Sequence, residues 1–373
     1  MMKITFNKPY FTGKETLYIE EAVSSGKISG NGFFTKKCQA FFEQKYGFKK
    51  ALLTTSCTDA LEMAAILINI KEGDEVIMPS FTFVSTANAF VLRGAKIVFA
   101  DSKVDHPNID ETKIENLISS KTRAIVVVHY AGHACEMDTI MTIAKKYNLF
   151  VIEDAAQAID SYYKGKPLGS IGHLAAFSFH ETKNIISGEG GLLVVNDERF
   201  VERSEIIWEK GTNRASFFRG EVDKYGWVDI GSSFLPSEVT AAFLWAQLEN
   251  LEDIQTKRKQ IWEQYAKGLK KWSIKNNIKL PMIPLYTTNN AHMFYLVCVN
   301  FEQRQIFIDR LKEKGILTVF HYLSLHESPY YKSKHDGRIL TESNKFSEVL
   351  VRLPLFYELD VEVVIQEILK IKI

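Results

Sequence analysis

Short apolar runs that alternate with helical patterns are the feature that most constrains the fold of this chain. The runs are rich in β-branched residues and are apolar without interruption, which is typical of strands covered on both faces. They occupy residues 74–83, 95–101, 123–132, 149–157, 174–180 and 191–197. Helical patterns such as 59–70 and 136–148 lie between them. This order predicts an α/β fold with a mainly parallel sheet, and functional groups just beyond the carboxyl ends of its strands.

A change of pattern near residue 250 predicts a second, smaller domain. The charged stretch 247–272 is expected to form one long helix. The stretches that follow predict a strand, a helix and a strand, at 291–300, 302–315 and 316–323. We therefore expect a large α/β domain over residues 1–250, which includes the N-terminal segment, and a small α+β domain over residues 251–373.

The charge balance and the cysteines exclude several classes of protein. Lysine and arginine total 46 against 45 acidic residues, so no net charge attracts the chain to nucleic acid or to an anionic membrane. Its four cysteines are widely spaced, which suggests neither a disulfide framework nor a zinc ribbon. No apolar stretch reaches the roughly 18 residues of a membrane span, and no secretory leader is evident. We expect a cytoplasmic protein.

Lys183 follows the predicted strand that ends at His180 and precedes Gly188, Gly190 and Gly191. A lysine withdrawn from water is uncharged part of the time, and its neutral amine can form an imine with an aldehyde. A lone lysine near glycines is more often a solvated surface residue, because lysine is rarely buried. A catalytic interpretation therefore depends on other stretches of the chain.

Two of these stretches place a carboxylate and an aromatic ring at strand ends. Asp154 ends an apolar run, where a carboxylate loses hydration unless a cation is near it, although it can equally cap a following turn. Phe83 ends another run, where its ring can stack on a flat heterocycle or simply pack in the core.

A third stretch predicts a helix N-terminus that can bind a phosphate. Cys57 and Thr58 precede an apolar helix, and Asp59 with Glu62 approximates a capping box. The free N–H groups and positive dipole end of such a helix suit an anion, and hydroxyls from Thr58 and Ser178 can complete the site. Nearly every helix has such a start, so this signal alone is weak.

Together these stretches supply what pyridoxal phosphate requires: an imine lysine, a carboxylate for the ring nitrogen, a stacking ring and a phosphate site. Asp154 would keep the pyridine nitrogen protonated. Lys183 would carry a proton between carbon atoms once an amino donor had displaced it.

The same stretches, "EDAAQ", "FSFHETKN", "GEGG", "PSFTFVSTANAF" and "SCTDALEMAA", resemble the DegT family of sugar-nucleotide aminotransferases. This family has the aspartate-aminotransferase-like fold type I. The stretches "GKISGNGFFTKKCQ", "VHYAGHACEMDTIM", "NAHMFY" and "VFHYLSLH" are similar to the subgroup that aminates C4 of dTDP-4-keto-6-deoxyglucose. The resemblance spans nearly the whole chain.

The resemblance implies which residues hold the cofactor. Lys183 forms the imine, and Asp154 partners the ring nitrogen. Gln157 would contact the ring on its phenolic oxygen side, and Phe83 would stack on the ring face. The phosphate would be bound by Cys57, Thr58 and Ser178. The substrate would be contacted by Arg214, Arg219, His321 and Tyr322. Two alternatives to substrate contact carry equal weight: the two arginines can belong to an exposed loop at the dimer interface, and His321 can have a purely structural role.

Family members are homodimers with active sites at the interface, so the 210–235 segment would reach the partner's pocket. Many relatives have an asparagine in the stretch that here reads "GSSFLPSE", and its side chain reaches the neighbour's phosphate. Leu235 occupies the aligned position, which puts that contact in doubt, although Ser232 or Ser233 can replace it.

The function implied by the resemblance is amino transfer from L-glutamate to C4 of dTDP-4-keto-6-deoxyglucose, giving dTDP-4-amino-4,6-dideoxygalactose by a two-stage, ping-pong reaction for lipopolysaccharide O-antigen synthesis. The alternatives are the gluco epimer, a keto-sugar dehydratase in which histidine replaces the lysine, and a noncatalytic sensor. A nicotinamide oxidoreductase is disfavoured because no G-x-G-x-x-G follows an early strand. His129, His133 and Cys135 are spaced like metal ligands, but no metal is expected because no fourth ligand is evident.

Overall fold

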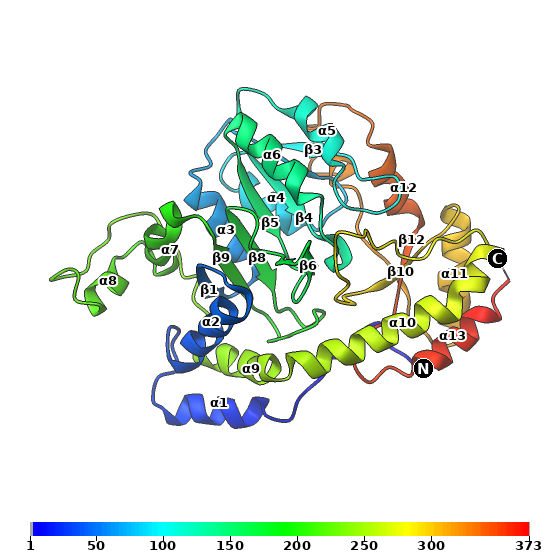
Figure 1. The fold of residues 1–373 in the computed structure, drawn as a ribbon, viewed down its shortest axis with the longest axis horizontal. Coiled ribbons are helices and arrows are strands. Elements are labelled where there is room, and N and C mark those ends of the chain that lie inside the picture. The colour runs from blue at the N-terminus through cyan, green and yellow to red at the C-terminus, as the bar shows by residue number, and fades with distance from the viewer. Residues whose placement is uncertain (1–2, 373) are drawn as a thin grey trace.

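The computed structural model describes residues 3–372 and is built around a seven-stranded sheet (Figure 1). The strand order is β1-β9-β8-β5-β4-β2-β3. The strands are β1 (Lys50–Thr54), β2 (Glu75–Pro79), β3 (Lys96–Ala100), β4 (Thr122–Val128), β5 (Phe150–Asp154), β8 (Leu174–Ser178) and β9 (Gly191–Val195). Five of them, from β3 to β8, pair in parallel, and β9 runs antiparallel to both β8 and β1. The predicted α/β fold with a mainly parallel sheet is confirmed.

Helices cover both faces of this sheet, which explains why its strands are apolar without interruption. Neighbouring residues of a strand point to opposite faces, so Val126 and Val127 of β4 pack in two different cores. One face is covered by α2 (Phe33–Tyr46), α6 (Met137–Tyr147) and α9 (Glu238–Glu249). The other face is covered by α3 (Cys57–Leu67), α4 (Val84–Val91) and α7 (Val201–Trp208).

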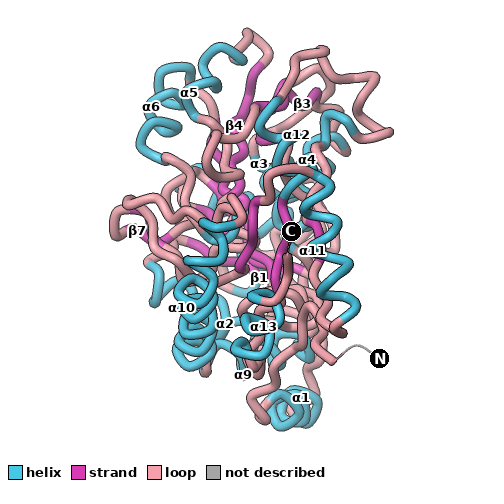
Figure 2. Tube along the Cα trace, turned by 90° about the vertical axis from the view of Figure 1, so that its right-hand side faces the viewer, coloured by secondary structure: helices cyan, strands magenta, loops and turns pink. Residues whose placement is uncertain are grey.

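The C-terminal part of the chain ends on the side that faces the viewer in Figure 2. It forms a second, antiparallel sheet with its own core. Its strand order is β10-β12-β11, with β10 at Phe294–Val297, β11 at Val319–Phe320 and β12 at Leu350–Leu353. The helices of this part are α10 (Leu251–Lys275), α11 (Phe301–Glu313), α12 (Thr341–Val349) and α13 (Val361–Leu369). The N-terminal segment joins it, because Ile4 bridges to Ile316. The division of the chain at residue 250 stays a prediction.

Two predicted elements of this part differ from the structure. The expected helix 247–272 is two helices, since α9 ends at Glu249 and α10 begins at Leu251. The expected strand 316–323 shrinks to the two residues of β11, because it pairs only with β12 at the sheet edge. The chain then leaves the sheet, and this departure carries His321 and Tyr322 into a cavity.

The remaining elements are short or peripheral. They are α1 (Glu15–Ser24), α5 (Glu111–Ile114), α8 (Arg214–Phe218), β6 (Tyr162–Tyr163), β7 (Lys166–Pro167) and the 3-10 turns η1 (Glu115–Leu117), η2 (Tyr130–Gly132), η3 (Glu198–Phe200) and η4 (Leu325–Glu327). In Figure 1, α8 lies at the far left, away from the central sheet. None of the helices in residues 3–372 combines the length and apolar character needed to span a bilayer.

Candidate active site

A cavity of about 580 Å³ lies where the carboxyl ends of the parallel strands meet the N-terminus of α3. Because parallel strands end at one edge of a sheet, the residues that follow them are brought together there. Most of the predicted site residues line this cavity, namely Cys57, Thr58, Phe83, Asp154, Gln157, Ser178, Lys183, His321 and Tyr322. The sequence-based grouping of these residues therefore agrees with their placement in space.

Lys183 lies in the loop between β8 and β9, which pair from Ser178 with Gly191 onward. The loop is held by its own backbone, since the N–H of Lys183 donates to the carbonyl of His180 at 2.9 Å. The side chain is half-buried, and withdrawal of its amine from water lowers the pKa of Lys183. The nearby Asp154 carboxylate opposes this shift without cancelling it. The amine is therefore neutral at lower pH than that of an ordinary lysine.

Asp154 is the last residue of β5, and its carboxylate is buried at the floor of the cavity. It accepts hydrogen bonds from the Thr86 hydroxyl at 2.7 Å and from the N–H of Ala156 at 3.2 Å. Burial raises the pKa of Asp154, although these two hydrogen bonds and the charge of Lys183 oppose the shift. A carboxylate fixed in this way is suited to bind a cationic nitrogen that enters the cavity.

The N-terminus of α3 forms another side of the cavity. Ser56 caps it by accepting the N–H of Asp59, so the expected capping box of Asp59 with Glu62 is wrong and the helix begins earlier. Strand β9 comes very close to this turn, because a Cβ added to Gly191 would lie 2.3 Å from the carbonyl carbon of Ser56. The Thr58 hydroxyl donates to that of Ser85 at 2.8 Å. This helix end can bind a phosphate.

Aromatic side chains form the wall opposite the sheet. The Phe83 ring is 55% exposed and lies 6.1 Å from that of Tyr322. Tyr322 stacks on His321 with ring centroids 3.6 Å apart, and its hydroxyl accepts a hydrogen bond from Gln157. His321 in turn forms a 2.7 Å hydrogen bond with the Tyr130 hydroxyl. These contacts hold the rings of His321 and Tyr322 in place at the cavity.

Sequence reasoning missed several polar residues of this cavity, among them Thr86 and Arg352. Thr86, which holds Asp154, is the third residue of α4, in a stretch noted only for Phe83. Arg352 lines the cavity from β12, a strand that was not predicted. An arginine inside the apolar run "VLVRLPL" is the signal that could have found it, because a charged side chain in a buried strand needs a polar site to face.

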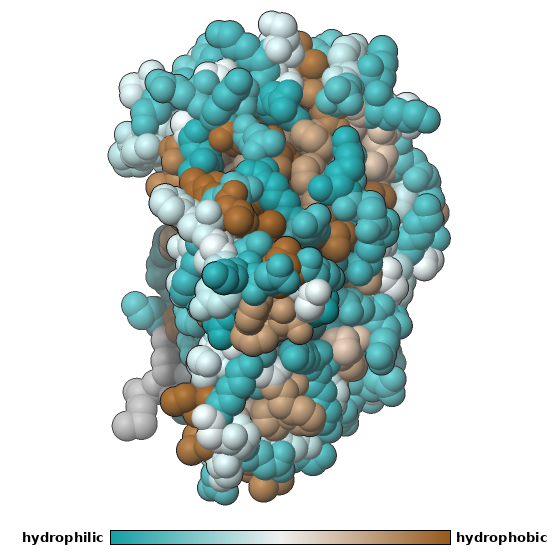
Figure 3. All heavy atoms as spheres, turned by 90° about the vertical axis from the view of Figure 1, so that its left-hand side faces the viewer, coloured by the Kyte–Doolittle hydropathy of each residue, from teal (hydrophilic) through white to brown (hydrophobic). Residues whose placement is uncertain are grey.

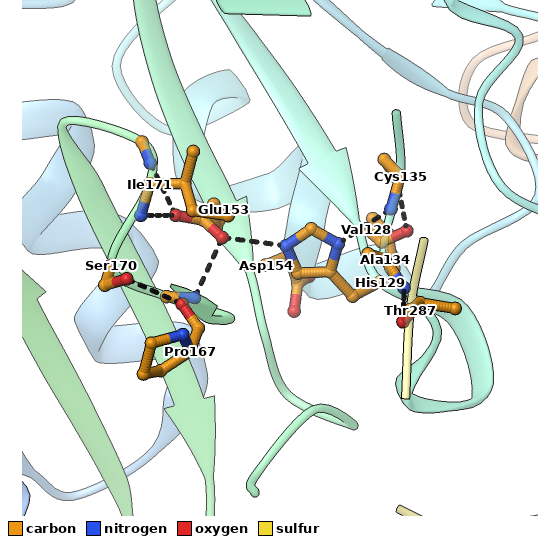
Figure 4. Close-up of polar contacts among 12 residues, drawn as sticks. Val128, His129, Ala134, Cys135, Glu153, Asp154, Pro167, Ser170, Ile171 and Thr287 are labelled. Atoms are coloured by element: carbon orange, nitrogen blue, oxygen red, sulfur yellow. Dashed lines mark hydrogen bonds and ion pairs between the residues drawn. The ribbon is translucent and has the colours of Figure 1, made fainter. Parts of the chain in front are cut away.

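His129 and Glu153 form a separate buried pair beside this cavity (Figure 4). The His129 Nδ1 accepts the N–H of Cys135, so its Nε2 carries the proton and donates to Glu153 at 2.9 Å. Burial alone would raise the pKa of Glu153, but His129 and the N–H groups of the 169–172 turn outweigh it and lower the pKa. The acidic neighbour of His129 was not foreseen, and its role is to anchor the 169–172 turn.

Arg214 and Arg219 do not line the cavity of Lys183. They line a second hollow together with Ser233 and Leu235, on the side of the molecule that carries α8. Arg219 forms salt bridges with two carboxylates there, whereas the Arg214 guanidinium lies 5.1 Å from the Phe218 ring. Within one chain these arginines are not part of the candidate site, and their contact with substrate stays a prediction.

Comparison with known proteins gives the family. Residues 9–371 match the model of the DegT/DnrJ/EryC1/StrS aminotransferase family. The chain belongs to this family. Among relatives of this DegT family, the GDP-perosamine synthase of Escherichia coli O157:H7 is 32% identical over 98% of this chain and 96% of its own. The aminotransferase TlmJ of Streptoalloteichus hindustanus superimposes with a TM-score of 0.90, at 27% identity, over 99% of this chain and 98% of its own.

A further similar structure identifies the cofactor. The sugar aminotransferase Spr1654 of Streptococcus pneumoniae has a TM-score of 0.89 and 25% identity over 98% of each chain, and it has been solved in its pyridoxamine phosphate and pyridoxal phosphate forms. The chain is therefore a pyridoxal-phosphate-dependent transaminase of the fold type I class that acts on a keto sugar with an amino donor. The cavity fits that cofactor, because it combines an amine of lowered pKa, a buried carboxylate and a helix N-terminus closely approached by Gly191.

Proposed function

We propose that this aminotransferase moves an amino group from L-glutamate to C4 of dTDP-4-keto-6-deoxyglucose and forms dTDP-4-amino-4,6-dideoxygalactose. The observation that carries the site assignment is the meeting of Lys183 and Asp154 in one cavity beside the α3 N-terminus. The nucleotide, the position of amination and the configuration at C4 rest on the sequence resemblance. The use in O-antigen synthesis and the cytoplasmic location rest on the sequence alone.

Pyridoxal phosphate, when bound, supplies a carbonyl carbon that accepts an amino group and a ring that accepts electrons from a broken bond. In this proposal Lys183 holds the cofactor covalently and later moves a proton at its Nζ, which its lowered pKa favours. Asp154 keeps a proton on the ring nitrogen, and Thr86 keeps the carboxylate in place. The α3 turn at Cys57 and Thr58, with Ser178, binds the phosphate.

The aromatic wall then orients the two flat reactants. In this proposal Phe83 stacks on the cofactor ring, and Gln157 lies at the phenolic oxygen side. Gln157 is held by the N–H of Ala131 and donates to Tyr322, so it links the cofactor side of the cavity with the side where the sugar would enter. His321 and Tyr322 contact the sugar.

A homodimer completes the proposed site. The 217–230 stretch exposes Phe218, Tyr225, Trp227, Val228 and Ile230. Figure 3, which views the molecule from the side of α8, shows hydrophobic side chains gathered in patches between polar ones on this face. Such patches are typical of protein–protein contacts. In the dimer, Arg214 and Arg219 would bind the nucleotide diphosphate of the partner's substrate, with Ser232 or Ser233 in place of the asparagine that Leu235 replaces.

One specific observation favours a second acceptor. The relative that matches 98% of this chain is named for GDP-perosamine, which is a GDP-linked sugar. A GDP-linked 4-keto-6-deoxy sugar is therefore the leading alternative, followed by the gluco epimer of the proposed product. Membership of an aminotransferase family and the presence of Lys183 disfavour the dehydratase and the sensor.

The proposal is tested by supplying the purified holoenzyme with glutamate and, in parallel, with dTDP- and GDP-linked 4-keto-6-deoxy sugars. We expect turnover with the dTDP sugar and, by NMR, an axial amino group at C4. Turnover with the GDP sugar alone would replace the proposed acceptor. Lys183→Ala is expected to abolish both the absorbance of the covalently held cofactor and the turnover.

A further inference from the structure

His292 is a buried histidine whose neighbours fix its proton on one ring nitrogen. Its Nδ1 lies 2.8 Å from Oδ1 of Asn184. Nδ2 of Asn184 donates both of its hydrogens, to Oε1 of Gln255 and to the backbone carbonyl of Asn290, each at 2.8 Å. A carbonyl can only accept, so the Asn184 amide has its nitrogen on that side and its oxygen toward His292. The histidine must therefore donate from Nδ1, which leaves a lone pair on Nε2 of the neutral ring.

The surroundings of this ring keep it uncharged. Arg258 donates to the backbone carbonyl of His292 at 2.7 Å, and Lys183 and Arg352 line the same cavity as the ring. Burial and these three cations hold the pKa of His292 well below its usual value. The Nε2 atom is therefore a hydrogen-bond acceptor at physiological pH.

This acceptor is unused, and it belongs to the cavity of Lys183. Among residues 3–372, Nε2 of His292 has no hydrogen-bond partner, although the ring lines the cavity. Asn184, which holds the ring, directly follows Lys183 in the chain, so the loop that carries the amine also fixes the acceptor. Of the charged groups near His292, Lys183 has the strongest influence on it. An enclosed acceptor without a partner indicates a donor that arrives during the reaction.

We propose that Nε2 of His292 accepts a hydrogen bond from Nζ of Lys183 once the amino donor has displaced the lysine from the cofactor. This inference rests on the proposed function, in which Lys183 then moves the proton. The two nitrogens are not hydrogen-bonded in the structure, and rotation of the flexible lysine stem joins them. His292 is thus a positioning residue, since it holds the amine and takes up no proton itself.

A neutral acceptor suits this task better than a carboxylate. A carboxylate beside the released amine would favour the ammonium form, whereas the amine must be neutral to receive a proton. In the proposed function Asp154, the carboxylate of the cavity, serves the ring nitrogen of the cofactor. The lone pair of a neutral imidazole directs one N–H of Lys183 and stabilises its ammonium form only modestly, so the proton can be released again.

The first test determines the tautomer in the wild-type protein. Nitrogen-15 spectra of the cofactor-free protein, labelled at histidine, should show Nδ1 of His292 protonated and Nε2 bare from about pH 5 to about pH 8. The signal is assigned by its loss in His292→Gln. A proton on Nε2 in this range, or a ring that becomes charged within it, would overturn the inference without any measurement of activity.

The second test measures the amine in holoenzyme loaded with pyridoxamine phosphate, in which Lys183 is free. The pH dependence of its acetylation, followed by mass spectrometry, gives the neutral fraction of the amine. Loss of the acceptor in His292→Phe should lower the pKa of Lys183 further and raise this fraction about tenfold at about pH 7. His292→Gln, whose amide oxygen can replace Nε2, should stay within about threefold of wild type. A purely structural disturbance would hydrate the amine and lower the neutral fraction. An unchanged or lower fraction in His292→Phe would overturn the inference.

The third test follows both half-reactions by cofactor absorbance. His292→Phe should slow each of them about 10- to 100-fold, because the amine is no longer aimed at the reacting carbon. The glutamate concentration at half-maximal rate should change less than about threefold. Glutamate deuterated at its α-carbon should slow the variant more than wild type, since removal of that proton becomes limiting. A loss confined to the reaction with the keto sugar would assign Nε2 to a sugar hydroxyl and overturn the inference.

His173→Phe is the matched control. Nδ1 of His173 also has a fixed partner, the N–H of Val151 at 2.9 Å, but the residue directly precedes β8 and does not line the cavity. This variant should match wild type in acetylation and in both half-reactions. Should His292→Phe fail to fold, the tautomer in wild type decides. If no amino acid converts wild-type cofactor to its amine form, the proposed function fails instead, whereas the tautomer and the acetylation can still be measured.

Discussion

At the scale of single residues, the cavity holds an amine and a carboxylate whose properties are set by burial. In the unfolded chain a lysine has a pKa of about 10.4, and in the fold the pKa of Lys183 is lower. At pH values between these two pKa values the folded protein binds fewer protons than the unfolded chain, so the stability of the fold rises with pH. At pH values below both pKa values, the cost of burying the charged amine is fully present.

The stability of the Lys183→Met variant, compared with that of wild type, should therefore be highest at neutral pH. For cofactor-free proteins, we expect the difference in melting temperature to shift in favour of wild type as the pH rises from about 7 to about 10. Thermal unfolding at several pH values measures this. A difference that does not depend on pH would show that the amine is not desolvated.

Asp154→Asn tests the carboxylate. The amide keeps the shape and can still accept from Thr86, but it cannot hold a proton on a ring nitrogen by charge. We expect the first half-reaction to slow by about 10²- to 10³-fold with the cofactor still bound. Asp105→Asn, at an exposed carboxylate, is the control and should behave as wild type. Retention of full rate in Asp154→Asn would remove Asp154 from the catalytic set.

A site residue could be predicted where its role is evident from the neighbouring sequence. It could not be predicted where its role depends on packing against a segment that is distant in the sequence. Asp154 ends one apolar strand and Lys183 follows another within five residues, and the two positions pointed to a site once they were considered together with the other stretches. Thr86 acquires its role only because α4 packs near the end of β5. Arg352 comes from β12, whose pairing with β10 and β11 no local pattern reveals.

At the scale of elements, the approach of β9 to the start of α3 shapes the phosphate side of the cavity. A methyl group at Gly191 would overlap the Ser56 backbone, and neither the strand nor the helix can move without disturbing its core. We expect Gly191→Ala to lower the free energy of unfolding by about 3 kcal/mol and to weaken cofactor binding about tenfold. Chemical denaturation and cofactor titration measure the two effects.

Gly188→Ala is the matched control for that substitution. Gly188 has a φ of +79°, and nothing lies within 4 Å of its added Cβ. We expect Gly188→Ala to lower the free energy of unfolding by about 1–2 kcal/mol, because alanine is strained in the left-handed backbone conformation. The affinity for the cofactor should be retained. Equal effects of the two substitutions on cofactor affinity would argue against a role for the close approach.

Element prediction succeeded where periodicity extends over a whole element. Strands β2 to β5, β8 and β9 were located within a few residues because both of their faces are buried. The break between α9 and α10 was missed, since it consists of Asn250 alone within a continuous helical pattern. β1 was missed because its short run leads directly into the α3 cap and was interpreted only as a helix start.

At the scale of the whole molecule, the exposed aromatic side chains near α8 predict self-association. Trp227 is 85% exposed. Tryptophan has the largest side chain of all residue types, and such exposure of it is unusual in a monomeric protein. We expect a dimer by sedimentation velocity, and Trp227→Glu should shift it toward monomer and reduce turnover. Leu285→Glu, at a fully exposed residue elsewhere, is the control. A wild-type monomer with full activity would contradict the interface site.

The pairing of Ser178 with Gly191 has a further consequence for how this chain can diverge. Residues 179–190 form a closed loop whose two stems both belong to the central sheet, and β9 is paired on its other side with β1. Adding or deleting one residue within the stems would invert every side chain of β9 and exchange its two cores. Insertions and deletions during evolution are therefore confined to the tip near Gly188 or to other loops. The position of the Lys183 amine is preserved because the strands on both sides of its loop are paired in the sheet.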